Sequence, residues 1–210
     1  MKRVSNYEVQ CEDWRKRFLG MDQADVRRRV PELREEGAYL TLWHFGRKLG
    51  IHRTEGTVSA LSDGQPVSVN ARMNVYTLLW YARPGARLRG EWVPFGELKN
   101  GGPFAPAFQR GVVELLARTL SGHEALLERA AVKLRGERIS ANGFQLPAFA
   151  CIPMRLYFWE GDEEFSAQAN LLFDRSATDF IHVESVVTIA SEGLRQLAAA
   201  VGLPLPDSAF

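Results

Sequence analysis

The sequence predicts an α+β protein, in which a mostly antiparallel sheet is packed by about five to six helices. Two patterns carry this prediction. Apolar residues recur every three or four positions in the segments expected to be helical, which are 5–34, 70–83, 104–134 and 185–201. Apolar and polar residues alternate in two other regions, 39–53 and 144–173. The sheet should therefore combine a short N-terminal meander with C-terminal hairpin strands.

The length and composition of the chain are those of one globular domain. It has 210 residues, of which 46% are hydrophobic and 24% charged, so it can bury a proper core. We expect one domain over residues 1–210, with a helical N-terminal part at about 5–34 and a loose tail at about 203–210.

The charge balance bears on partners and location. The formal net charge is +1, whereas nucleic-acid binding usually needs a basic excess, so a nucleic-acid partner is not expected. Apolar runs are far shorter than the roughly 20 residues that cross a bilayer, and the first residues lack the apolar stretch of a signal peptide. We expect a cytoplasmic protein that does not bind membranes, with a small molecule or a protein as its unknown partner.

The two cysteines limit the metal chemistry available. Cys11 and Cys151 are far apart in sequence and neither belongs to a CxxC pair, so we expect neither an Fe–S cluster nor a structural zinc. Each lies in apolar sequence and is interpreted as an inert core thiol. The nucleotide-binding, zinc-protease and serine-hydrolase motifs are missing too, so the cofactor stays unknown.

Local signals place several residues. A tight turn at Gly46 should put His44 and His52 on opposite faces of the first hairpin, where they do not share a metal. Asn70 is the expected cap of a helix. Residues 92–95 are expected to form a loop, and Phe104 to begin the buried stripe of the helix that follows.

The last hairpin carries the most information. With Gly161-Asp162 as its tip, Trp159 should face Glu164 and Phe158 should face Phe165. One face is then wholly apolar. The other face presents the polar and aromatic residues Arg155, Tyr157, Trp159, Glu164, Gln168 and Asn170.

This polar face has two interpretations. It is either the solvent side of an antiparallel sheet or a binding surface. Arg155 offers a planar fork to a carboxylate or phosphate, and Tyr157 and Trp159 offer apolar area with polar tips. Our leading hypothesis is an accessory module that binds a ligand, cofactor or partner there.

Two alternatives belong to other classes. The first is an enzyme that uses carboxylates and a histidine, with Glu164, Asp174, Asp179 and His182 as general acid/base groups or metal ligands. A weak metal site would consist of Asp179, His182 and Glu184. The second is a protein-interaction subunit, which would expose Trp14, Trp43 or Trp92.

The phrases WEGDEEF at 159–165 and LFDRSA at 172–177 resemble an uncharacterised prokaryotic family, domain of unknown function 3786. The resemblance marks Trp159, Gly161, Asp162, Glu164, Phe165, Phe173 and Asp174. It implies a family found mainly in anaerobic bacteria and archaea, some of whose members carry a cysteine-rich Fe–S segment. The two cysteines of this chain depart from that pattern, and the resemblance supplies no catalytic residues.

Overall fold

The structure is a computed structural model that describes residues 6–204. Its N-terminal part has two helices, α1 (Asn6–Leu19) and α2 (Gln23–Arg29), followed by an antiparallel sheet in the order β1-β2-β3-β4. The strands of this sheet are β1 (Arg34–Glu36), β2 (Tyr39–His44), β3 (Arg47–His52) and β4 (Val58–Ala60). The predicted tail from 203 onwards falls mostly outside the described residues.

A second antiparallel sheet, in the order β5-β9-β8-β7-β6, forms the C-terminal body. Its strands are β5 (Trp92–Pro94), β6 (Glu137–Arg138), β7 (Gly143–Phe149), β8 (Ile152–Trp159) and β9 (Gln168–Asp174). The predicted α+β class is confirmed, and the strands make two separate sheets.

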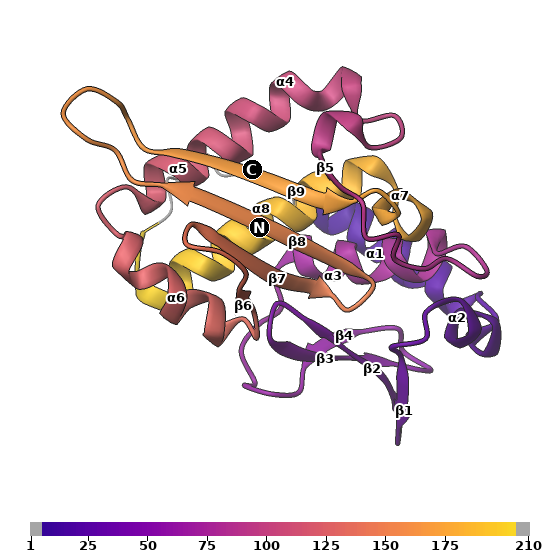
Figure 1. Ribbon diagram of the computed structural model, residues 1–210. Helices are drawn as coiled ribbons and strands as arrows, with labels where there is room; N and C mark the ends of the chain where they lie inside the picture. The colour runs from indigo at the N-terminus through magenta and orange to yellow at the C-terminus, as the bar shows by residue number, and fades with distance from the viewer. Residues whose placement is uncertain (1–5, 205–210) are drawn as a thin grey trace.

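The helices pack on one side of the five-stranded sheet. Figure 1 shows α8 (Val183–Val201) crossing behind β8 and β9, with the other helices of the body around it. These are α3 (Val69–Tyr81), α5 (Glu114–Leu120), α6 (Glu124–Lys133) and the single turn α7 (Ala177–Phe180). Before α5 the chain passes through η1 (Phe95–Glu97), η2 (Gly102–Phe104), α4 (Ala105–Phe108) and a π-helical segment, η3 (Gln109–Val113). The inward face of the sheet is therefore covered, and its outward face is open.

The turn between β2 and β3 joins the two sheets. His44 Nδ1 lies 2.6 Å from the carbonyl oxygen of Ala148, and the Phe45 amide donates to the Pro147 carbonyl. Phe45 and Gly46 both have positive φ, at 45° and 77°, which gives a tight two-residue hairpin turn. The buried Phe45 ring meets α8 at Gly193, where a Cβ would lie 2.9 Å from its Cζ atom.

Some local predictions were right. The registers Leu42↔Leu49 and His44↔Arg47 leave a two-residue turn, so His44 and His52 lie on opposite faces as expected. His44 is buried in the core.

Other local predictions were wrong. Ser68, rather than Asn70, caps α3, because its hydroxyl accepts the Ala71 amide. The expected loop at 92–95 contains β5, whose proline is tolerated because the strand lies at a sheet edge. Phe104 is 38% exposed instead of buried.

The close approach at Gly193 predicts a sensitive site. The free energy of unfolding of Gly193→Ala should be about 1–3 kcal/mol lower than that of the wild type. The reason is that its methyl group would press on the Phe45 ring and on Met154 Cε, 2.9 Å away. Urea denaturation measures this change. Gly20→Ala is the matched control, since its Cβ would meet only the Arg17 carbonyl oxygen at 3.5 Å. Equal stability of the two variants would contradict tight packing at Gly193.

Candidate functional site

Five of the six side chains predicted for the binding face lie together. The register pairs Tyr157 with Asn170 and Trp159 with Gln168, and Arg155 precedes them on β8. Their neighbours in sequence, such as Leu156 and Phe158, are buried on the other side. Because side chains alternate along a strand, the five point outward, away from α8.

The sixth residue, Glu164, is not on this face. The register is shifted by four positions from the predicted one, so Glu164 and Phe165 lie in the loop 160–167. Phe165 was expected in the apolar face and is 64% exposed. A shift by an even number keeps every strand residue on its predicted side, so the rest of the face is unchanged.

Arg155 occupies the middle of the outward face. Its guanidinium lies 3.7 Å from the centroid of the Trp92 ring, and its Nε donates to Gln145 Oε1 at 3.1 Å. The Gln145 amide in turn donates to Glu137. Within residues 6–204 no carboxylate forms an ion pair with Arg155. Its outer N–H groups can therefore receive an anion, while stacking and one hydrogen bond fix its plane.

Tyr157 and Trp159 extend this surface along β8. Their rings stack with centroids 6.2 Å apart and planes 18° from parallel. Tyr157 lies against Gly143 of β7, where a Cβ would be 2.8 Å from the ring. Trp159 is 43% exposed. The face thus joins a cationic fork to a planar apolar platform, with the exposed amides of Gln168 and Asn170 beside it.

Two acids of the WEGDEEF turn, Glu160 and Asp162, accept hydrogen bonds within the chain. The Glu160 carboxylate accepts the Gly122 amide at 2.9 Å, and this hydrogen bond leads a set that lowers its pKa. Asp162 accepts the amides of Glu164 and Phe165, each at 2.8 Å. A Cβ at Gly161 would lie 2.7 Å from the Ala167 amide. These contacts fix the loop and link it to the turn between α5 and α6.

Asp174, a carboxylate of the enzyme hypothesis, has partners within the chain. Burial would raise the pKa of Asp174, but hydrogen bonds from Ser176, Arg89 and Gly90 outweigh it and lower that pKa. Asp174 therefore anchors the loop before β5. Glu164 precedes the start of β9 and Asp174 ends it, so the strand alone separates them by about 20 Å.

Two of the predicted metal ligands, Asp179 and His182, make contacts that serve the fold. Asp179 pairs with Arg83 and Arg89 at 3.4 and 2.6 Å. His182 caps α8, and its Nδ1 accepts the amide of Glu184. In the part of the chain that the structure describes, no three His, Cys, Asp or Glu side chains are placed to hold one metal ion.

The tryptophans of the interaction hypothesis each lie under an arginine. Trp43 is covered by Arg135 at 3.9 Å, Trp14 by Arg17 at 4.6 Å, and Trp92 by Arg155. Trp43 is exposed, whereas Trp14 and Trp92 are half-buried.

Among the described helices, none is long and apolar enough to cross a membrane.

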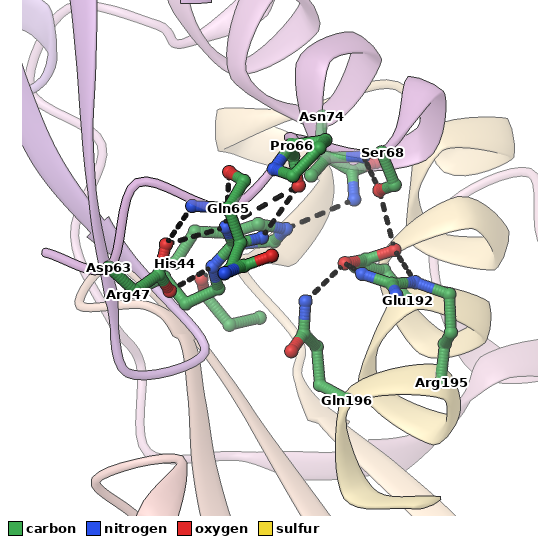
Figure 2. Close-up of polar contacts among 12 residues, drawn as sticks. His44, Arg47, Asp63, Gln65, Pro66, Ser68, Asn74, Glu192, Arg195 and Gln196 are labelled. Carbon is green, nitrogen blue, oxygen red and sulfur yellow. Dashed lines mark hydrogen bonds and ion pairs between the residues drawn. The ribbon is translucent and has the colours of Figure 1, made fainter. Parts of the chain in front are cut away.

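Sequence reasoning missed a buried polar network, shown in Figure 2. Glu192 on α8 is 0% exposed. It accepts hydrogen bonds from Ser68 at 2.8 Å, from Arg195 at 2.9 and 2.6 Å, and from Gln196 at 2.7 Å. Burial would raise its pKa, but these bonds and the charge of Arg195 lower it, so Glu192 stays ionised. The only signal in the sequence was the i, i+3, i+4 spacing of Glu192, Arg195 and Gln196.

The buried histidine His44 lies close to this network. The Ala148 carbonyl can only accept, so His44 carries its proton on Nδ1, and Nε2 accepts from the Asn74 amide at 3.4 Å. Thr188 donates to the oxygen of the same amide at 2.5 Å. Burial lowers the pKa of His44 to about 4. The imidazole is therefore neutral, and a second proton would face the Asn74 donor.

A cavity of about 580 Å³ lies next to this network. Arg47, Lys133 and Arg195 line it. Each already has a partner, because Arg47 pairs with Asp63, Lys133 donates to the Ala200 carbonyl, and Arg195 pairs with Glu192. The cavity also borders the C-terminal ends of α6 and α8, whose carbonyl dipoles attract cations. These basic groups therefore serve the fold.

These features define an α+β protein whose five-stranded sheet has helices on one face and an arginine-aromatic surface on the other. The chain belongs to the family described as domain of unknown function (DUF3786), whose sequence model matches residues 26–195. No curated protein and no solved structure matches the chain.

The buried imidazole predicts a specific pH dependence. His44 has a folded pKa of about 4 against an ordinary 6.5, so its contribution is complete above pH 6.5 and is lost as the pH falls toward 4. Between pH 6.5 and 4.5 this group alone should lower the free energy of unfolding by about 2 kcal/mol, and the carboxylates with lowered pKa values add to the loss only below about pH 5, where they take up protons in the unfolded chain.

Urea denaturation of the wild type and of His44→Gln at several pH values checks this. The glutamine variant should be less stable at pH 7 and should lose most of the slope between pH 6.5 and 4.5. His123→Gln, at a partly exposed turn, should keep the slope. A wild-type stability that is flat over this interval would contradict a buried neutral His44.

Proposed function

We propose that this protein is a binding module, and that its ligand is a planar apolar group carrying a carboxylate or phosphate, held on the outward face of the five-stranded sheet. The ligand is a small molecule, a cofactor or a segment of a partner protein. The observation that carries the proposal is the geometry of Arg155, whose guanidinium is fixed by Trp92 and Gln145 without an ion-pair partner among the described residues.

The neighbours of Arg155 support the proposal. The stacked Tyr157 and Trp159 give a flat platform next to the fork, and aromatic residues and arginine are enriched where proteins bind partners. Gln168 and Asn170 are exposed on the adjacent strand and supply hydrogen-bond donors and acceptors. An anion on Arg155 would lie beside the platform, so both parts of such a ligand are contacted together.

An enzyme that uses Glu164 and Asp174 together fits this arrangement poorly. Glu164 precedes β9 and Asp174 is its last residue, and the Asp174 carboxylate is buried and accepts hydrogen bonds from its own chain. The sheet face itself presents a cation and aromatic rings, which suit recognition better than proton transfer at neutral pH.

The test is a titration with 3-phenylpropionate, compared with the uncharged 3-phenylpropan-1-ol. The indole N–H signals of Trp92 and Trp159, assigned by single Trp→Phe variants, should shift saturably with the anion in two-dimensional NMR. The alcohol should bind about tenfold or more weakly, because it lacks the charge-assisted pair with Arg155. The proposal would be contradicted if neither probe produced a saturable shift of these signals.

Variants separate binding from stability. Arg155→Ala should abolish the saturable shift of the Trp92 and Trp159 signals while lowering the free energy of unfolding by only about 0.5–1.5 kcal/mol, since it removes one stacking contact and one hydrogen bond. Trp159→Ala should also weaken binding and leave the melting temperature nearly unchanged. Arg87→Ala, in an exposed loop, is the control for the loss of one positive charge. A stability loss of several kcal/mol in both face variants would mark the two residues as structural.

A further inference from the structure

A second cavity lies among the helices, away from the outward face of the five-stranded sheet. It measures about 450 Å³ and is enclosed by the starts of α1 and α3, by η2 and by the first turns of α8. Its lining includes Tyr7, Val69, Asn70, Phe104, Glu184 and Val187. A volume of this size is within the range of about 300–1,000 Å³ typical of small-molecule sites.

Most of the cavity wall is apolar. Val69 and Val187 form part of it, and Tyr7 and Phe104 lie at its sides with 58% and 38% of their surface exposed. Large apolar side chains that remain exposed around a hollow leave contact area for a ligand. Four separate elements surround the space, so it fits a compact molecule better than a helix of a partner.

The polar groups of the cavity fall into two sets. Thr188 and Ser191, on α8, are already engaged, since Thr188 donates to Asn74 and Ser191 donates to the Val187 carbonyl. The Asn70 side-chain amide forms no hydrogen bond with any other described residue. The basic atom paired with the Glu184 carboxylate among the described residues is His182 Nδ1, at 3.8 Å, and this nitrogen accepts the Glu184 amide instead of donating to the carboxylate.

The charge of the lining selects the ligand. Among residues 6–204, none that lines the cavity is basic, and Glu184 adds one negative charge. Glu184 would therefore repel an anion, and no partner would compensate for this. An ammonium group could instead pair with Glu184 and donate to the side-chain carbonyl oxygen of Asn70.

We propose that this cavity is a second binding site, for a small molecule with an apolar body of about one ring and a single ammonium group that contacts Glu184. The site is independent of the sheet face, because it uses the opposite charge and different elements. Glu184 also lies in the first turn of α8, where a carboxylate favours the helix dipole. The test must separate that role from ligand binding.

The probe is 3-phenylpropylammonium, compared with 3-phenylpropan-1-ol and 3-phenylpropionate, on the full chain at constant ionic strength. Backbone amide signals of Val69, Asn70, Phe104 and Val187 should shift saturably with the amine at millimolar concentration, less strongly with the alcohol, and not with the anion. Glu184→Gln should weaken the amine about three- to tenfold and change the affinity for the alcohol less than twofold. A loss of helix stability alone would affect both probes equally.

The second part of the test fills the cavity with a larger side chain. Val187→Trp should abolish binding of the amine and the alcohol, and Val132→Trp, the same change at a 64% exposed site on α6, should not. Arg155→Ala should also leave amine binding unchanged, which distinguishes this site from the sheet face. The proposal is overturned if the amine gives no saturable shift at these amides, if phenylpropionate binds there as tightly as the amine, or if Val187→Trp binds normally while remaining folded.

Discussion

The turn between β2 and β3 is the contact on which the arrangement of the molecule depends. It inserts Phe45 against Gly193 of α8, places His44 on the Ala148 carbonyl, and brings Gly46 against the end of α6. It therefore helps to fix the N-terminal sheet on the C-terminal body. The left-handed backbone of Phe45 costs free energy of about 1–3 kcal/mol, which the buried ring contacts must offset. Glycine at 193 is required by the closeness of that ring, and not by its own backbone angles.

The C-terminal hairpin shows what the sequence could and could not specify. Alternation of apolar and polar residues determines which side of the sheet each residue occupies, so Arg155, Tyr157 and Trp159 could be assigned to one face from the residues alone. The pairing itself was shifted by four, because burial constrains the side and not the position of the turn. That position is set by Glu160 and Asp162, which accept backbone amides in the loop. Such local bonds leave no periodic signal.

The polar core was beyond prediction for a different reason. Glu192 interrupts an apolar helix face, and nothing in the pattern says that Ser68, more than a hundred residues earlier, supplies one of its donors. Its compensation depends on how α3 and α8 meet, which is a tertiary property. Hairpin geometry placed His44 and His52 on opposite faces, but neither the burial of His44 nor its partner Asn74 followed from it. Helices, strands and faces were therefore accessible from the sequence, whereas the contacts between distant segments were not.

The joint at Phe45 has a consequence for biosynthesis. The β2–β3 hairpin is made of local pairs and can form soon after it leaves the ribosome, but its docking site on α8 is made about 150 residues later. At the usual rate of roughly 5–20 residues per second, the hairpin waits for on the order of 10–30 s before Gly193 exists. During that interval the side chain of Phe45 has no final packing partner on α8. The packing of the N-terminal sheet at Phe45 is therefore completed only after translation has reached the final helix of the described chain.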